Sequence, residues 1–270
     1  MGNASLCCPE ESFTISLVEQ SLVPRQFFEI LFSAKNHPQA WNWIQEKGSS
    51  QHLSFAKDPS KTTQTVFAAS YSLTELDQLP EWIYKFPKLI LIEPSTQEDG
   101  RRLMQWRQQL IDKGYHIEAP CTHQGACPLL TQSPKDWCHD RILFQQPVWF
   151  QKIEQHLPMK NRSLTFSYLI ASKTTSKTEV RKQDTSAAKV DAADSSMEKL
   201  ARLVGDPMEE KGKTRQLVCM DERRLFLAWM HRKIQPPNYL RGIQVFLPTD
   251  LEIKSNELRI NQDLQILMKK

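Results

Sequence analysis

The strongest constraint on the fold of this chain is a dense group of cysteines and histidines between residues 119 and 139. The segment Ala119-Pro-Cys-Thr-His-Gln-Gly-Ala-Cys-Pro128 is followed by Asp136-Trp-Cys-His139. Core cysteines are usually scattered singly along apolar strands, so packing does not account for this density. Thiolates brought together by a short loop with prolines are what zinc or an iron–sulfur cluster needs. The segment therefore predicts a metal-binding loop.

Neighbouring cysteines can also be free thiols or a disulfide, so this alternative has to be weighed. No apolar signal segment begins the chain, and the six cysteines are unevenly spread over 270 residues. This pattern argues against a disulfide framework and for a reducing compartment. We therefore expect a cytoplasmic, bacterial protein without a targeting peptide. The longest apolar runs, such as residues 89–92, are far too short to span a membrane, and no membrane partner is expected.

The cysteine segment resembles that of the methyltransferase-like proteins that act in small-ribosomal-subunit assembly, a family with members in mitochondria and bacteria. Other stretches resemble the same family, and they are Ala69-Ser-Tyr-Ser-Leu-Thr-Glu-Leu76, Leu89-Ile-Leu-Ile-Glu-Pro-Ser-Thr96 and Ser163-Leu-Thr-Phe-Ser-Tyr-Leu-Ile170. In the second stretch, Ser95 replaces the family's glycine. The resemblance covers residues 13–172 well and the C-terminal part loosely.

The resemblance implies that four cysteines hold a [4Fe–4S] cluster. Three of them match the loop cysteines Cys121, Cys127 and Cys138. The family's fourth ligand lies on a strand after a variable insertion, and Cys219 in Arg-Gln-Leu-Val-Cys-Met-Asp is our candidate for it. Cys7 and Cys8 have no counterpart in the family pattern.

The residues alone leave the metal open, because iron and zinc both accept thiolate ligands. His123 and His139 could act as ligands in a mixed zinc site, or they could point to solvent or to phosphate. Trp137 is expected to pack against the apolar shell of the site, where it would limit solvent access.

Residues 13–120 read as alternating strands and helices. The runs at 13–18, 66–70 and 89–92 predict strands, a helical stretch is expected at 27–32, and residues 97–113 predict an amphipathic helix that Gly114 ends. Strands that alternate with helices indicate an α/β fold with a mostly parallel, doubly wound sheet. By resemblance, this sheet would be a truncated class I methyltransferase-like sheet.

Composition divides the chain into three parts. Residues 1–172 form the methyltransferase-like α/β domain, which includes the loop 119–141, and residues 173–214 are polar and read as a flexible insertion. Residues 215–270 predict a small, barrel-like β-rich module, with ten Lys and Arg against six Asp and Glu. A basic surface is either ordinary solvated surface or faces RNA. The candidate RNA contacts are His139, Arg141, Arg223, Arg224, Arg232 and Lys233.

The glycine-rich loop that S-adenosylmethionine requires in a methyltransferase is missing from this sequence. No Gly-x-Gly-x-x-Gly occurs among its eight glycines. Met1-Gly2-Asn3 could be the tail of such a loop in a longer chain, and Glu19 stands where such folds place the acidic residue that holds the ribose. Gly2, Glu19 and Ser70 are therefore the candidate cofactor contacts, and no catalytic residue can be named.

Three functions remain open. The first is an iron–sulfur factor of small-ribosomal-subunit assembly and translation that binds rRNA and is expected to be a monomer. The second is an active S-adenosylmethionine-dependent rRNA methyltransferase, which requires the missing N-terminal part. The third is a zinc-stabilised RNA-binding protein.

Overall fold

The computed structural model describes residues 15–18, 41–44, 66–74, 76–158, 162–173, 199–248, 251 and 253–267. The chain divides into two compact units, Met1–Lys57 and Asp58–Lys270. In the first unit, β1 (Ile15–Val18) pairs in parallel with β2 (Trp41–Ile44). The strand predicted at 13–18 is therefore confirmed, and the helical stretch predicted at 27–32 lies outside the described residues.

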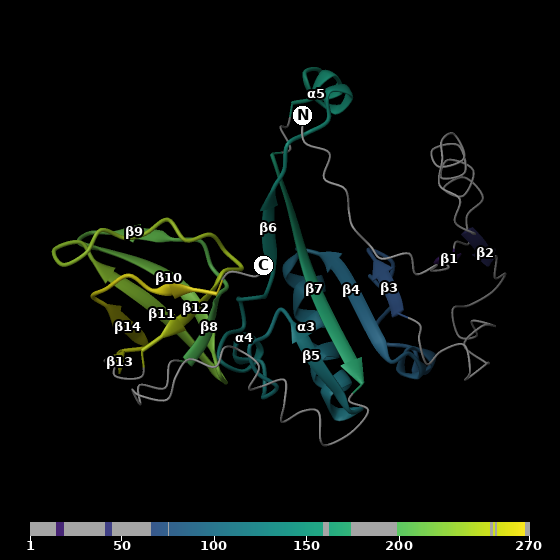
Figure 1. Cartoon of the computed structure of the whole chain (residues 1–270), viewed down its shortest axis with the longest axis horizontal. Coiled ribbons are helices and arrows are strands. Elements are labelled where there is room, and N and C mark those ends of the chain that lie inside the picture. Colours follow the sequence, from purple (N-terminus) through teal and green to yellow (C-terminus); the bar gives the residue numbers. More distant parts are fainter. Residues whose placement is uncertain are drawn as a thin grey trace, which may run out of the picture. The chain divides into compact units, whose positions relative to one another are not determined.

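The second unit begins with a five-stranded sheet (Figure 1). Its strands follow the order β3 (Val66–Ser70), β4 (Lys88–Pro94), β7 (Ser163–Lys173) and β5 (Tyr115–Ala119), and β6 (Asp140–Leu143) pairs with the free end of β7. The strands predicted at 66–70 and 89–92 are confirmed, and the stretch 163–170 that resembles the family lies in β7.

The sheet is mixed rather than mostly parallel, and the prediction is wrong in this respect. β3 and β4 are parallel, whereas β7 is antiparallel to β4, β5 and β6. β4 and β5 run in the same direction, as a βαβ unit requires, but β7 lies between them. Apolar runs predict that a segment is a strand; they do not predict that a later strand will pair between two earlier ones.

Helix α3 (Gln97–Asp112) connects β4 to β5 and packs on β4, β5 and β7. The Thr96 hydroxyl accepts a hydrogen bond from the Asp99 backbone N–H at 3.1 Å, which caps the first turn. Leu103, Trp106 and Leu110 are buried. The helix ends at Gly114, whose φ of 83° lies in the left-handed region. The helix predicted at 97–113 is confirmed.

Three shorter helices belong to the same unit. They are the 3-10 helix η2 (Glu81–Lys85), α4 (Pro128–Thr131) in the cysteine loop, and α5 (Val148–Glu154) between β6 and β7. No helix in the described ranges is both long and apolar enough to cross a membrane.

An eight-stranded, β-rich sheet follows, shown in green to yellow in Figure 1. Its strands are β8 (Lys199–Leu203), β9 (Met208–Glu210), β10 (Lys213–Met220), β11 (Arg223–Met230), β12 (Gln244–Leu247), β13 (Ile253–Lys254), β14 (Glu257–Ile260) and β15 (Gln265–Ile266). The sheet begins inside the range 173–214 that composition assigned to an insertion, because β8 and β9 belong to it. Residues 174–198 lie outside the described residues.

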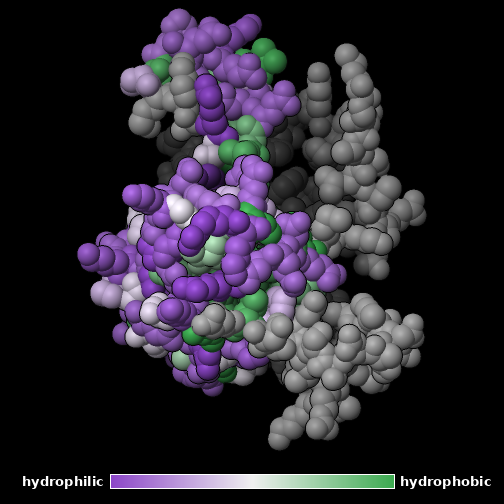
Figure 2. Space-filling model, turned by 90° about the vertical axis from the view of Figure 1, so that its left-hand side faces the viewer, coloured by the Kyte–Doolittle hydropathy of each residue, from purple (hydrophilic) through white to green (hydrophobic). Residues whose placement is uncertain are grey.

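This sheet encloses an apolar core of its own. Leu203, Val218, Leu227, Val245 and Ile260 are among its buried members, and they come from five different strands. Tyr239 and Leu264, which lie outside the strands, belong to the same buried cluster, so the sheet and its connecting segments cover this core together. The outer face of the module is mostly hydrophilic (Figure 2).

A second, smaller cluster joins the two sheets. Met104 of α3 and Leu129 of α4 pack with Val204 and Leu217 of the eight-stranded sheet. Cys127, Cys138 and Cys219 contact this cluster from its edge. The junction between the sheets is therefore where the cysteines meet.

Candidate metal centre

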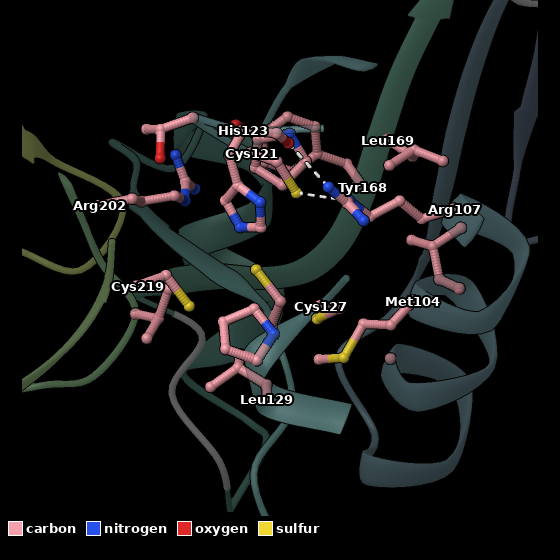
Figure 3. Close-up of a pocket in the computed structure, with 17 residues that line it drawn as sticks. Met104, Arg107, Cys121, His123, Cys127, Leu129, Tyr168, Leu169, Arg202 and Cys219 are labelled. Atoms are coloured by element: carbon pink, nitrogen blue, oxygen red, sulfur yellow. Dashed lines mark hydrogen bonds between the residues drawn. The ribbon is translucent and has the colours of Figure 1, made fainter. Parts of the chain in front are cut away.

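Four cysteines that are far apart in the sequence line one cavity at the junction of the two sheets. Cys121 follows β5, Cys127 precedes α4, Cys138 precedes β6, and Cys219 lies in β10. Figure 3 shows Cys121, Cys127 and Cys219 around this space. The cavity has a volume of about 40 Å³. A single water molecule needs roughly 10–15 Å³ of such volume, so the cavity is larger than one water. The structure thus brings together the four cysteines that the sequence proposed as ligands.

Arg107 of α3 holds the first part of the cysteine loop. Its Nε donates to Cys121 Sγ at 3.0 Å, its Nη1 to the Gly125 carbonyl at 2.8 Å, and its Nη2 to the His123 carbonyl at 2.7 Å. The side chain is only 1% exposed. A buried guanidinium therefore fixes the loop backbone and places positive charge beside one thiol.

The second part of the loop is held by neighbours on α3 and β7. Arg101 Nη1 donates to the carbonyls of Ser133 and Asp136 at 2.9 and 2.8 Å. The Ser167 hydroxyl donates to the Cys138 carbonyl at 2.8 Å. The Trp137 indole N–H donates to the Ser95 carbonyl at 2.8 Å, and its ring packs against the shared cluster, as expected.

The eight-stranded sheet contacts the loop around the turn between β10 and β11. Gln132 Nε2 donates to the Glu222 carbonyl at 2.7 Å, and Gln132 Oε1 accepts from the Arg224 backbone N–H at 3.0 Å. Arg224 Nε donates to Asp136 Oδ2 at 2.5 Å. Because Arg224 is opposite Cys219 in the β10–β11 ladder, these contacts set the position of the fourth cysteine relative to the loop.

Arg202 of β8 is the second cation at the cavity. Its Nη2 donates to both Asp140 oxygens, at 2.5 and 2.6 Å, and its Nη1 donates to the Gly242 carbonyl at 3.0 Å. Burial by itself lowers the pKa of Arg202. The negative charges that Cys138 and Asp140 carry when ionised outweigh this effect, so the pKa of Arg202 lies above its usual value. Arg107 and Arg202 approach the cavity from opposite sides in Figure 3.

The thiols are poor acids in this environment when nothing compensates their charge. Burial raises the pKa of Cys138 to about 12, and burial also raises the pKa values of Cys121 and Cys219. Arg107 and Arg202 offset this effect only in part. A bound cationic centre would supply the missing compensation, because coordination deprotonates a thiol outright.

The surroundings of the two loop histidines disfavour the protonated, charged form of each ring. Burial, followed by the charge of Arg241, lowers the pKa of His139 to about 4. Burial, followed by Arg107, lowers the pKa of His123. His139 stacks on Trp137 with 5.2 Å between ring centroids, and its Nδ1 lies 3.5 Å from Arg241 Nη1. These contacts hold the His139 ring between Trp137 and Arg241, and its predicted RNA contact stays a prediction.

The lining of the cavity combines thiols with polar atoms that have no hydrogen-bond partner. Within the described ranges, no three His, Cys, Asp or Glu side chains are arranged to hold one metal ion. Three buried polar atoms at the cavity have no hydrogen-bond partner there, and they are Thr122 Oγ1, His123 Nδ1 and Arg202 Nε. Four thiols and three unpartnered polar atoms therefore surround one space.

Most of the other residues that were predicted to contact RNA or the cofactor, where the structure describes them, lie on the surface. Arg141 is exposed and pairs with Asp206 at 3.5 Å, and Arg223, Arg232 and Lys233 are exposed. Arg224, by contrast, is held by Asp136 and belongs to the contact between the sheets. Ser70 is exposed at the end of β3. Gly2, Glu19, Cys7 and Cys8 lie outside the described residues.

The sequence analysis did not select the two arginines of the cavity. Arg107 could have been found, because residues 103, 107 and 110 follow the i, i+4, i+7 spacing of the buried face of α3. A charged residue on that face needs a buried partner. Arg202 carries no comparable signal, since its role depends on the pairing of β8 with β10 and β12.

This protein has a mixed α/β sheet and a β-rich module, and a thiol-lined cavity lies where the two meet. The sequence profile of one family, described as mitochondrial small ribosomal subunit Rsm22, matches residues 62–233. This match covers more than half of the chain, and the chain belongs to that family. No individual curated protein matches it.

The family assignment confirms the predicted link to the small ribosomal subunit and to translation. It also corrects the predicted location. The family is that of a mitochondrial ribosomal subunit protein, so the expectation of a bacterial cytoplasmic protein is wrong, and the family points to mitochondria. The absence of a visible targeting segment was a poor guide, because it depends on where the sequence begins.

Proposed function

We propose that this protein is a methyltransferase-like, iron–sulfur-binding factor of mitochondria. It acts in assembly of the small ribosomal subunit or in translation, and it binds the rRNA of that subunit. The observation that carries the proposal is the convergence of Cys121, Cys127, Cys138 and Cys219 on one cavity. The family assignment supplies the ribosomal context.

The four cysteines would each bind one iron of a [4Fe–4S] cluster. Arg107 and Arg202 would stabilise the negative charge of the thiolates, and Trp137 and Leu129 would limit access of water. When bound, the cluster supplies either a structural link between the two sheets or an electron-transfer centre. Zinc also accepts four thiolates, so the choice of the cluster rests on the resemblance of the four-cysteine pattern to that of the family.

The first test replaces each cysteine in turn with serine. Each of the four variants, purified without oxygen, is expected to lose iron and sulfide together and to unfold at a lower temperature, because cluster binding is coupled to folding. Iron and sulfide analysis and the charge-transfer absorbance at roughly 400 nm provide the measurement.

Cys7→Ser and Cys8→Ser are the matched controls, and both should keep the wild-type iron content. Stoichiometric zinc in the wild-type protein, with no iron under anaerobic conditions, would favour a zinc site instead. Full iron retention in Cys219→Ser would remove that residue from the ligand set.

The rRNA contact is expected on the exposed basic residues of the eight-stranded sheet. Neutralising Arg232 and Lys233 together should weaken co-sedimentation with small subunits and flatten its salt dependence, by roughly 0.7–0.9 in the logarithmic slope for each phosphate that is no longer neutralised. Lys211→Ala, on another exposed turn of the same sheet, is the control. An unchanged slope in the double variant would contradict an RNA contact at these residues.

A further inference from the structure

An apolar arm extends from the five-stranded sheet beside the candidate metal centre. We define the arm as residues 140–166, which comprise β6, α5 and the beginning of β7 (Figure 1). Its large apolar side chains are between 45% and 69% exposed, and they are Ile142, Leu143, Val148, Trp149, Ile153, Leu157 and Leu164. Single exposed apolar residues are normal on a surface, whereas seven within one 27-residue segment suggest an interaction site.

The geometry of the arm explains why these side chains are exposed. Within the described residues, β6 pairs only with β7, and β4 reaches β7 only as far as Phe166. Residues 163–165 and β6 therefore form a two-stranded ribbon. Ile142 and Leu143 point to opposite faces of the ribbon because side chains alternate along a strand, and both are exposed. A ribbon of this kind is only marginally stable in water unless something covers it.

The base of the arm is anchored to the sheet. Ser95 Oγ donates to Thr165 Oγ1 at 2.7 Å, and Asp140 forms the buried ion pair with Arg202. The arm is thus a built extension whose position is fixed at one end. Its tip carries the first and most exposed turn of α5, where Val148 and Trp149 lie.

The charges of the arm are one-sided. Lys152 and Arg162 are exposed, and Arg141 is exposed but pairs with Asp206 at 3.5 Å. The two acidic residues of the described part of the arm are used internally, since Asp140 pairs with Arg202 and the buried Glu154 accepts from Gln146 Nε2 at 2.8 Å. The arm therefore presents an apolar surface with a basic border.

The type of apolar residue distinguishes a protein partner from RNA. Proteins read single-stranded RNA by stacking bases on aromatic rings. Six of the seven arm side chains that are at least 45% exposed are aliphatic, and the seventh is Trp149. The partly exposed Phe150 packs edge-on against Trp149, with 5.6 Å between the ring centroids. A tryptophan surrounded by aliphatic residues, with arginine at the edge, is the composition of a protein–protein interface core.

We propose that the arm docks into an apolar groove, bordered by carboxylates, on a protein of the small ribosomal subunit. This inference rests on the proposed association with that subunit. The aliphatic side chains and Trp149 fill the groove, and Lys152 and Arg162 face its acidic border. The arm and the basic surface of the eight-stranded sheet then contact the subunit independently, one through protein and the other through rRNA.

The test compares wild type with the double variant Leu143→Ser, Trp149→Ser in co-sedimentation with purified mitochondrial small subunits over a series of salt concentrations. Removing two central apolar side chains should weaken binding by at least about tenfold at every salt concentration. The salt slope should stay unchanged, because the double variant keeps every basic residue that could bind phosphate. Ile253→Ser, at an exposed apolar residue of β13, is the matched control and should bind as wild type does.

A photo-crosslinking residue at Ile153 identifies the partner. Crosslinks to a subunit protein that survive ribonuclease support the proposal, and crosslinks to rRNA overturn it in favour of an RNA contact. Wild-type affinity in the double variant overturns the inference and leaves the proposed function standing. Failure of wild type to bind the subunit overturns both. Unchanged iron content and melting temperature in the double variant establish that it is folded.

Discussion

The two halves of the candidate metal centre are held in place by different kinds of interaction. The loop half, residues 119–141, carries three of the cysteines, and its backbone is fixed mainly by single side chains such as Arg101 and Arg107. The strand half carries Cys219 inside the continuous ladder of β10 and β11. A ladder distributes stability over many hydrogen bonds, whereas the loop depends on a few residues. Substitutions should therefore damage the loop half more than the strand half.

The largest loss of stability is expected at the ion pair between Asp140 of the loop half and Arg202 of β8, the strand that pairs with β10. Arg202→Met removes the partner of the nearly buried Asp140, and breaking a buried pair in this way costs about 3–5 kcal/mol in the free energy of unfolding. Urea denaturation provides the measurement. If the loss stays below about 1 kcal/mol, the pair behaves like an exposed one and does not join the halves.

The double variant Arg202→Met, Asp140→Leu is the control for this pair. It leaves no buried charge behind, so it should be more stable than Arg202→Met alone. If the double variant loses as much free energy of unfolding as the two single variants lose together, the two residues act independently.

An intermediate effect is expected from Arg107→Lys in the loop half. Lysine keeps the charge but cannot reach Cys121 Sγ and the carbonyls of His123 and Gly125 together, so about 2–3 kcal/mol should be lost. Amide hydrogen exchange should increase in the loop and stay unchanged in β10. Arg215→Lys, at partly exposed ion pairs of the eight-stranded sheet, is the control and should cost less than about 1 kcal/mol.

The smallest effects concern two glycines that border the loop. A Cβ at Gly100 would lie 2.6 Å from Trp137 Cδ1 and 3.0 Å from Ser167 Oγ, so Gly100→Ala should cost about 1–3 kcal/mol through overpacking. A Cβ at Gly125 would meet the Glu222 side chain, which is exposed and can turn away. Gly125→Ala should therefore cost less than about 0.5 kcal/mol. Equal losses in thermal unfolding would contradict this ranking.

Local patterns were enough to predict much of the fold. The apolar runs at 66–70 and 89–92 and the helical spacing at 97–113 correspond to β3, β4 and α3. The reason is that periodic burial is written directly into the order of residues. The same patterns gave the wrong sheet direction, since they do not encode which strand pairs between β4 and β5.

For the site, the sequence by itself pointed to the three loop cysteines as candidate ligands, because candidate ligands that are close along the chain leave a recognisable spacing. Cys219 was selected only through a family resemblance. Its place beside the loop cysteines depends on the register of β10 with β8 and β11 and on the packing of Leu129 against Leu217. The tertiary structure alone brought Arg202 to the cavity and left the arm uncovered, since burial and exposure depend on contacts between segments that are far apart in the sequence.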